Sequence, residues 1–111
     1  MFARVTEYTP KLEKKDELIK MVRQEILPIL KKQPGFLELL PLVPEITSEK
    51  FITIGLWTGK TEAEKFVKEV FPKVEQMLKP FLTTPTAYTV KTYAVETTIC
   101  QHLVDTLMAA A

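Results

Sequence analysis

Hydrophobic and polar residues alternate with a period of two in residues 2–8 and 51–57, and this alternation predicts two β-strands. Two further strands are predicted over residues 36–43 and 88–95. Pro41 lies inside the first of these. Because proline cannot donate a hydrogen bond to a neighbouring strand, it indicates an edge strand or a β-bulge.

Apolar residues at steps of three and four predict a helix over residues 16–32. Pro28 falls inside this pattern and removes one backbone hydrogen bond, so we expect a kink or an early helix end there. A second apolar stripe runs over residues 63–81 and crosses Pro72. Since proline is well tolerated in the first turn of a helix, two helices that meet at this proline are expected.

Two helix starts carry the spacing of a capping box, in which a hydroxyl and a carboxylate or amide three residues later satisfy free backbone N–H groups. Thr61 and Glu64 have this spacing before the long apolar stripe. Thr98 and Gln101 have it before a short C-terminal helix. Both pairs are therefore predicted to begin helices.

The predicted order is strand, helix, strand, strand, helix, strand, followed by the C-terminal helix. This is the order of the ferredoxin-like split βαβ fold, an α+β class with a four-stranded antiparallel sheet. Because crossover connections are right-handed, both main helices should cover the same face of the sheet. We expect residues 1–96 to form this domain and residues 97–111 to form a helical extension.

Strand alternation separates two sets of side chains, which must lie on opposite faces of the sheet. The aliphatic set comprises Ala3, Val5, Ile52, Ile54 and Leu56, and the aromatic set comprises Phe2, Tyr8, Phe51 and Trp57. If the aliphatic set meets the helices, the aromatic face is too apolar to remain in water. A second copy of the chain is the simplest cover, so we expect a homodimer, which the C-terminal helix could clasp.

Composition narrows the classes of function. The chain has 111 residues, 46% of them hydrophobic and 26% charged, which is the balance of one folded domain. Its 15 basic and 14 acidic residues are interleaved, so neither a nucleic acid nor a membrane surface is an expected partner. No apolar run is long enough to span a bilayer, and the N-terminus lacks the pattern of a signal peptide. Cys100 is the sole cysteine, which favours a reducing compartment and therefore a cytoplasmic location.

Cys100 and His102 are the only soft metal ligands in the sequence. With one residue between them on a helix, they point in different directions. No further cysteine or histidine exists to complete a zinc site of three or four ligands. The same geometry argues against a Cys–His catalytic pair, so no metal site is expected.

Three segments of the chain carry a resemblance to a known family. They read YTPKLEKKDEL after the first strand, then PGFLEL, then FITIGLWTGKTEAEKF. This pattern resembles the antibiotic biosynthesis monooxygenase family of dimeric α+β barrels, over nearly the whole chain up to Val95. The resemblance implies a barrel of two subunits. Members of that family include cofactor-free oxygenases of polycyclic phenols, quinol oxygenases, haem-degrading enzymes and proteins of unassigned activity.

The haem-degrading branch of that family pairs a tryptophan at the end of the third strand with a histidine in the following helix and an asparagine in the first strand. Trp57 matches the tryptophan. Residues 62–70 contain no histidine, and the chain contains no asparagine. Both departures argue against haem, so no cofactor is expected.

Arg4 is the candidate catalytic residue, as the cation that stabilises a phenolate or enolate. A charge in mid-strand is costly unless it is paired, solvated or held for a ligand. The candidate substrate-binding residues are Trp57, Thr6, Phe51 and Tyr88. Alternation places Trp57 on the face away from the helices, whereas the family has its pocket between sheet and helices, and the sequence leaves this question open.

The favoured hypothesis is a cofactor-independent monooxygenase, or a degenerate relative, that acts on a small aromatic phenol or quinol. In such chemistry the substrate anion itself reduces dioxygen inside a dry cavity. The alternative is a non-enzymatic dimeric barrel that binds a small apolar ligand or serves as a dimerisation module. Its support is that the sequence shows no strong general base.

Overall fold

A computed structural model describes residues 1–46, 49–84 and 88–110 of the chain. The strands are β1 (Phe2–Tyr8), β2 (Phe36–Leu42), β3 (Phe51–Trp57) and β4 (Tyr88–Ala94). The α-helices are α1 (Lys15–Met21), α2 (Leu27–Lys31), α3 (Lys60–Glu69), α4 (Phe71–Leu78) and α5 (Gln101–Ala110). A π-helical segment (Val22–Ile26) joins α1 to α2, and short 3-10 turns occur at Leu12–Lys14 and Lys79–Phe81.

The four strands form one antiparallel sheet in the order β2-β3-β1-β4. This order confirms the predicted ferredoxin-like α+β fold. β2 lies at the edge of the sheet, as Pro41 indicated. The register of β2 against β3 shifts between Phe36 and Glu38. This irregularity lies three to five residues before Pro41 and not at the proline itself.

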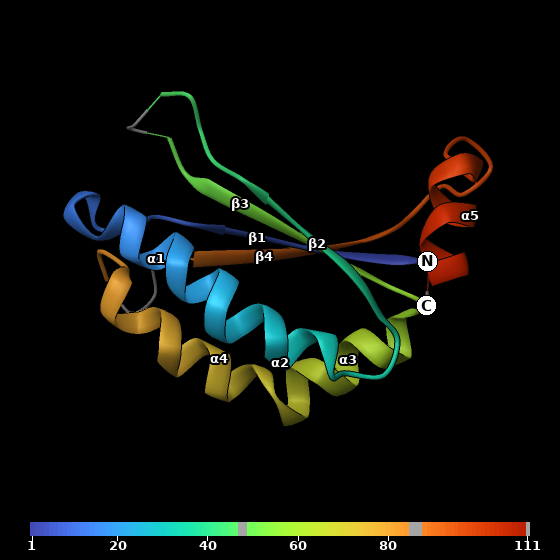
Figure 1. Ribbon diagram of the computed structural model, residues 1–111, viewed down its shortest axis with the longest axis horizontal. Coiled ribbons are helices and arrows are strands. Elements are labelled where there is room, and N and C mark those ends of the chain that lie inside the picture. Colours follow the sequence, from blue (N-terminus) through green and yellow to red (C-terminus); the bar gives the residue numbers. More distant parts are fainter. Residues whose placement is uncertain (47–48, 85–87, 111) are drawn as a thin grey trace.

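The helices α1 to α4 form one layer against a single face of the sheet (Figure 1). α5 stands apart from this layer, at the end of the sheet where β1 begins (Figure 1). At that end the Val95 N–H donates a 3.0 Å hydrogen bond to the carbonyl of Met1. Among the described residues, no helix is long and apolar enough to cross a membrane.

The aromatic set of the strands faces the helices, which answers the question that the sequence left open: the aliphatic set does not meet the helices. Tyr8, Phe51 and Trp57 are buried in one core cluster with residues of the helices. The aliphatic set therefore lies on the outer face. Alternation defines two faces but not which one is covered, and here the wide space between sheet and helices takes the bulky side chains.

The first long helix does not end at Pro28. It changes to π-helical geometry over Val22–Ile26, and Pro28 then lies in the first turn of α2. A proline donates no backbone hydrogen bond, and a wider turn just before it accommodates the missing bond. The result keeps Val22 and Ile26 directed at the sheet, where both line a cavity described below.

The helix break at Pro72 is confirmed, because α3 ends at Glu69 and α4 begins at Phe71 with the proline in its first turn. Both predicted capping boxes are wrong. α3 has Gly59 as its N-cap, with no side-chain capping bond. A Cβ on that glycine would lie 2.8 Å from a Glu62 carboxylate oxygen, so the Glu62 side chain would have to shift to admit one.

At the C-terminal helix the hydrogen bonds also differ from the prediction. α5 begins at Gln101, and the Thr98 hydroxyl donates to the Glu96 carboxylate at 2.6 Å. The backbone N–H of Thr98 donates to the same carboxylate at 3.2 Å. Thr98 is therefore bonded to Glu96, two residues earlier in the chain, and does not cap the helix.

Candidate functional site

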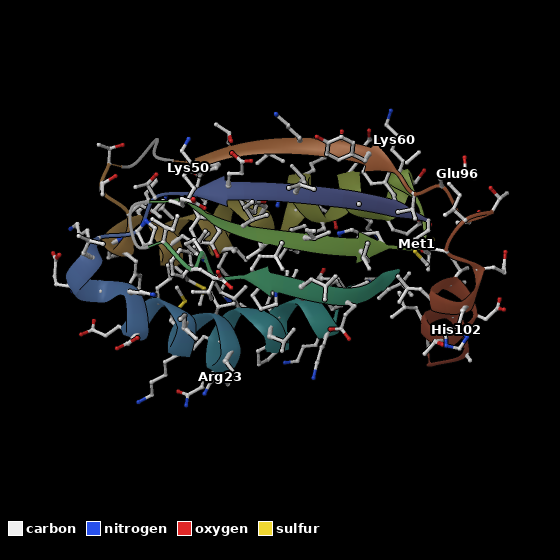
Figure 2. The ribbon with its side chains drawn as sticks, turned by 90° about the horizontal axis from the view of Figure 1, so that it is seen from above. Met1, Arg23, Lys50, Lys60, Glu96 and His102 are labelled. Carbon is white, nitrogen blue, oxygen red and sulfur yellow. The ribbon has the colours of Figure 1, made fainter. Side chains whose placement is uncertain are left out.

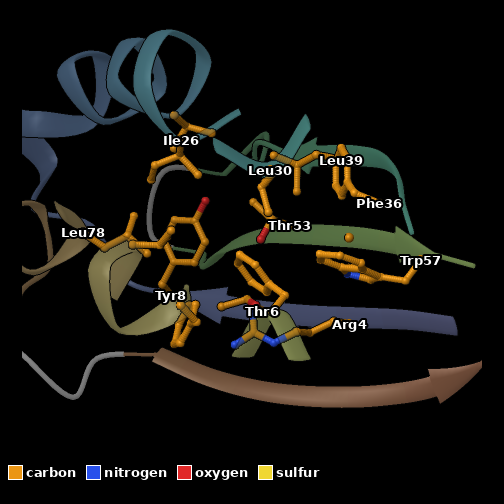
Figure 3. A pocket seen from close by; sticks show the side chains of 15 residues that line it. Arg4, Thr6, Tyr8, Ile26, Leu30, Phe36, Leu39, Thr53, Trp57 and Leu78 are labelled. Atoms are coloured by element: carbon orange, nitrogen blue, oxygen red, sulfur yellow. The ribbon is translucent and has the colours of Figure 1, made fainter. Parts of the chain in front are cut away.

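A cavity of about 60 Å³ lies between the inner face of the sheet and the helices. Its polar side chains all come from the two central strands: Arg4, Thr6, Tyr8 and Thr53. Its aromatic side chains come from both layers: Phe36, Trp57, Phe66 and Phe71. Figure 3 shows the strand residues Arg4, Thr6 and Trp57 on one side of this space, with Ile26 and Leu30 opposite. Such a site, apolar with a few polar groups, is typical of small-molecule binding.

Arg4 is half-buried on β1, and its guanidinium carbon lies 4.2 Å from the centroid of the Phe71 ring. Burial lowers the pKa of the guanidinium, and the neighbouring Tyr88 partly opposes this effect. Among the ion pairs between described residues, none involves Arg4. The aromatic ring therefore stabilises the cation without neutralising it.

Tyr88, at the start of β4, lies next to the Phe71 ring of this pair. Its ring packs edge-on against Phe71, with the centroids 6.2 Å apart. Its hydroxyl donates to the carboxylate of Glu75 on α4, and this hydrogen bond, followed by burial, raises the pKa of Tyr88. Tyr88 is thus held as a neutral phenol beside the Arg4 and Phe71 pair.

Trp57 forms an aromatic wall at the end of β3. Only 1% of its surface is exposed. Phe36 meets it edge-on at a centroid distance of 5.4 Å, and Phe66 lies tilted against it at 5.1 Å. These contacts fix the indole ring in place, so one side of the cavity is rigid.

Tyr8 brings a buried hydroxyl to the middle of the site. Burial raises the pKa of Tyr8 to about 12, and a hydrogen bond with Thr53 acts in the opposite direction. The Tyr8 hydroxyl is therefore protonated at neutral pH. It serves as a hydrogen-bond donor or acceptor and does not act as a base there.

A second, larger cavity of about 240 Å³ lies next to the first. Tyr8, Val22 and Leu39 line both cavities. The larger one is otherwise lined by aliphatic side chains and Phe51, with Arg23 as its charged residue. The two spaces are therefore neighbours that share three side chains.

The structure distributes the predicted site residues over these spaces. Arg4, Thr6 and Trp57 line the smaller cavity, and Phe51 lines the larger one. Tyr88 is not among the described residues that line either cavity, although it contacts Phe71.

Sequence reasoning missed several lining residues. Thr53 and Gly55 alternate with the same period as Trp57 and should have been placed beside it. Phe66 and Phe71 were recognised only as part of the apolar stripe of a helix. Nothing in their spacing distinguishes a side chain that lines a cavity from one that fills the core.

The two soft metal ligands lie outside this region. His102 is exposed on α5, at the end of the sheet (Figure 2). Cys100 directly precedes that helix in the sequence. Among the described residues, no group of three or more His, Cys, Asp or Glu side chains is placed to hold a metal ion.

Comparison with known proteins identifies the fold through structure only. No protein-family model matches the sequence, and no curated protein matches it either. Solved structures do match. One is a monooxygenase from the ActVA-Orf6 gene of Streptomyces coelicolor in complex with nanaomycin D, with a TM-score of 0.71, 10% identity, and coverage of 86% of this chain and 87% of that one.

Two other structures illustrate the range of neighbours. SnoaB, a cofactor-independent oxygenase from Streptomyces nogalater, has a TM-score of 0.66 and 13% identity over 86% of this chain and 92% of that one. MhuD, a haem-degrading protein of Mycobacterium tuberculosis solved with two haems in its active site, has a TM-score of 0.66 and 14% identity over 86% and 96%. The ferredoxin-like α+β fold of the single chain, which the resemblance to antibiotic biosynthesis monooxygenases implied, is thereby confirmed. At these identities the likeness shows the fold alone.

Proposed function

We propose that the chain is a cofactor-independent monooxygenase that binds a small aromatic phenol or quinol between its sheet and its helices. The observation that carries the proposal is Arg4, a half-buried cation that lines an aromatic cavity and has no ion pair among the described residues. An unpaired guanidinium in such surroundings is costly unless an anion uses it. A phenolate or enolate supplies that anion, and Trp57 supplies an apolar aromatic wall beside its oxygen-bearing end.

The reaction needs dioxygen and the substrate alone. A hydroquinone carbon gains one oxygen atom, and the second oxygen leaves as water with two hydrogens of the substrate, so the product is a hydroxyquinone. The substrate anion provides the electrons. The protein lowers the energy of that anion through the positive charge of Arg4, and its apolar walls exclude bulk water.

One observation favours the alternative, a barrel that binds an apolar ligand without turning it over. The ionisable side chains among the described residues that line the two cavities are Arg4, Tyr8 and Arg23. None of the three is a general base at neutral pH. Under the enzyme hypothesis the substrate must therefore lose its proton to water, assisted by the lowered energy of the anion beside Arg4.

Oxygen uptake with a panel of anthrones and hydroquinones tests the proposal. We expect uptake above background for the wild-type chain, and at least a tenfold loss in Arg4→Met. Trp57→Phe should weaken binding of the panel. Lys60→Met, which removes an exposed charge on α3, is the matched control and should leave uptake unchanged. Absence of uptake across the whole panel, with binding retained, would establish the alternative.

A homodimer is part of the proposal, because the outer face of the sheet is apolar. Leu40, Leu42 and Tyr93 are 43%, 47% and 50% exposed. Leu40 and Leu42 pair with half-buried Ile54 and Ile52 on β3, and Tyr93 pairs with Ala3 on β1. Figure 2 views this face and shows the strands without a covering helix, with α5 at one end. A second copy covers such a face symmetrically, and residues 97–111 would clasp it. With a single cysteine per chain, we assign this dimer to the reducing cytoplasm.

A further inference from the structure

The smaller cavity is too small for an aromatic ring. It measures about 60 Å³, whereas an apolar cavity of roughly 150 Å³ is known to bind benzene. A volume of 60 Å³ is enough for about two water molecules, each of which occupies roughly 30 Å³ in the liquid. The space beside Arg4 and Trp57 therefore admits an oxygen-bearing end of a ligand, or dioxygen, but not the ring.

The larger cavity has the size and the chemistry for the remainder of the ligand. Its volume of about 240 Å³ exceeds what a single ring needs. Ile19, Leu27 and Phe51 are among its lining residues, and its one charged residue, Arg23, has an exposed side chain. Hydrocarbon gains free energy by entering such a space in proportion to the area removed from water.

The two cavities meet at Tyr8. Tyr8 lines both of them, together with Val22 and Leu39. Of these three side chains, Tyr8 is the one with a polar group, its hydroxyl. Figure 3 shows the Tyr8 side chain extending from the strand that also carries Arg4 toward the helix that carries Ile26. A hydroxyl at this junction is placed to hydrogen-bond a phenolic oxygen that passes from one space to the other.

We propose that the two cavities form one bipartite site, in which the larger cavity holds the hydrocarbon body of a phenol or quinol and the smaller one receives its oxygen-bearing end. This inference rests on the proposed function for the phenolic end. It adds the ligand class: a phenol or quinol with an alkyl chain that fills the larger cavity, in preference to a bare hydroquinone.

A series of 4-alkylphenols from phenol to 4-heptylphenol tests this inference, because these probes measure binding without turnover. Titration calorimetry should show the dissociation constant falling about fourfold for each added methylene until the larger cavity is full. The matched alkylbenzenes, which lack the hydroxyl, should bind at least tenfold more weakly at each chain length. An affinity that does not rise with chain length overturns the inference.

Two variants test where the alkyl chain of the ligand binds. Ile19 and Val43 line the larger cavity but not the smaller one, so Ile19→Phe and Val43→Phe fill it from different sides. Each should weaken 4-heptylphenol at least tenfold and weaken phenol less, because the ring of phenol occupies only part of the larger cavity. Val43 is 47% exposed, so its variant should fold even if the other does not. Ile99→Phe, at a position that is 84% exposed, is the matched control and should change neither affinity.

The outcomes separate this inference from the proposed function. Chain-length dependence that Val43→Phe removes, without oxygen uptake for any quinol, supports the bipartite site and overturns the monooxygenase. Equal loss of phenol and 4-heptylphenol in both cavity-filling variants overturns the bipartite site, as does the absence of binding by every member of the series. If the bipartite site is overturned in either way, oxygen uptake that depends on Arg4 would still support the monooxygenase proposal.

Discussion

The Arg4 guanidinium lies 4.2 Å from the centroid of the Phe71 ring, so the central strand β1 and helix α4 meet through a cation–π contact at the wall of the smaller cavity. The contact holds the charge in place from one side. A carboxylate in the same position would neutralise the charge and leave nothing for an anionic ligand. The contact with Phe71 therefore leaves the positive charge of Arg4 available to bind an anionic ligand.

Replacing Phe71 by leucine removes the ring but keeps an apolar side chain. Cation–π contacts are worth about 0.5 to 2 kcal/mol, depending on burial, so Phe71→Leu should weaken binding of a phenolate about fivefold. Calorimetric titration with 4-butylphenol near pH 10 measures this. Phe81→Leu is the control, since its ring lies 5.9 Å from the ammonium of Lys14 and lines neither of the two cavities. Equal losses in the two variants would contradict a specific role for the Arg4 and Phe71 pair.

Gly55 keeps the smaller cavity open. A Cβ at this position would lie 3.4 Å from the indole nitrogen of Trp57 and 3.8 Å from the Arg4 carbonyl, which are ordinary contacts. Gly55→Val should therefore fill the cavity without disrupting β3, and valine is favoured over glycine in strands. We expect binding to fall at least tenfold while the free energy of unfolding in urea stays equal or rises by about 0.5 kcal/mol.

Gly55→Ala is the graded control for this position, because its single methyl group leaves part of the cavity open. It should weaken binding less than the valine variant does. A valine variant that binds ligands as tightly as the wild type would show that the smaller cavity is not used.

Tyr8 predicts a dependence of stability on alkaline pH. Its pKa is raised to about 12 by burial, against roughly 10 in an unfolded chain. The unfolded chain therefore loses this proton first. The stabilising contribution is complete below pH 10 and is lost as the pH rises toward 12, by roughly 3 kcal/mol in total.

Urea unfolding at pH 9 and pH 11.5 measures this dependence. Tyr8→Phe should reduce the difference in unfolding free energy between the two pH values, because it removes the titrating group. An identical pH dependence in wild type and Tyr8→Phe would show that Tyr8 does not titrate in this range.

Leu40 tests the outer face of the sheet. It pairs with Ile54 across β2 and β3 and is 43% exposed. Leu40→Lys places a charge in the proposed interface, so light scattering at micromolar concentration should show a dimer for wild type and a monomer for the variant. Val67→Lys makes a similar change at a helix position that is 39% exposed and should remain dimeric. A monomeric wild type would contradict the dimer.

Local pattern was sufficient for the elements and their order. The alternation in β1 and β3 gave both strands with the bounds that the structure has, and Pro72 marked the break between α3 and α4. These features depend on residues close together in the sequence. The predicted capping boxes were wrong because other groups can compete with the helix end for the threonine hydroxyl. Thr98 is an example, since its hydroxyl and its backbone N–H both bond to Glu96.

The sequence by itself therefore determined the fold class, the edge position of β2 and the grouping of Arg4, Thr6 and Tyr8 on one face. Only the tertiary structure decided that this face meets the helices, because alternation is unchanged when the two faces of a sheet are exchanged. It alone placed Phe71 of α4 over Arg4 of β1 and joined two cavities at Tyr8. These relationships connect side chains that are far apart in sequence, and their distances follow from how the layers pack.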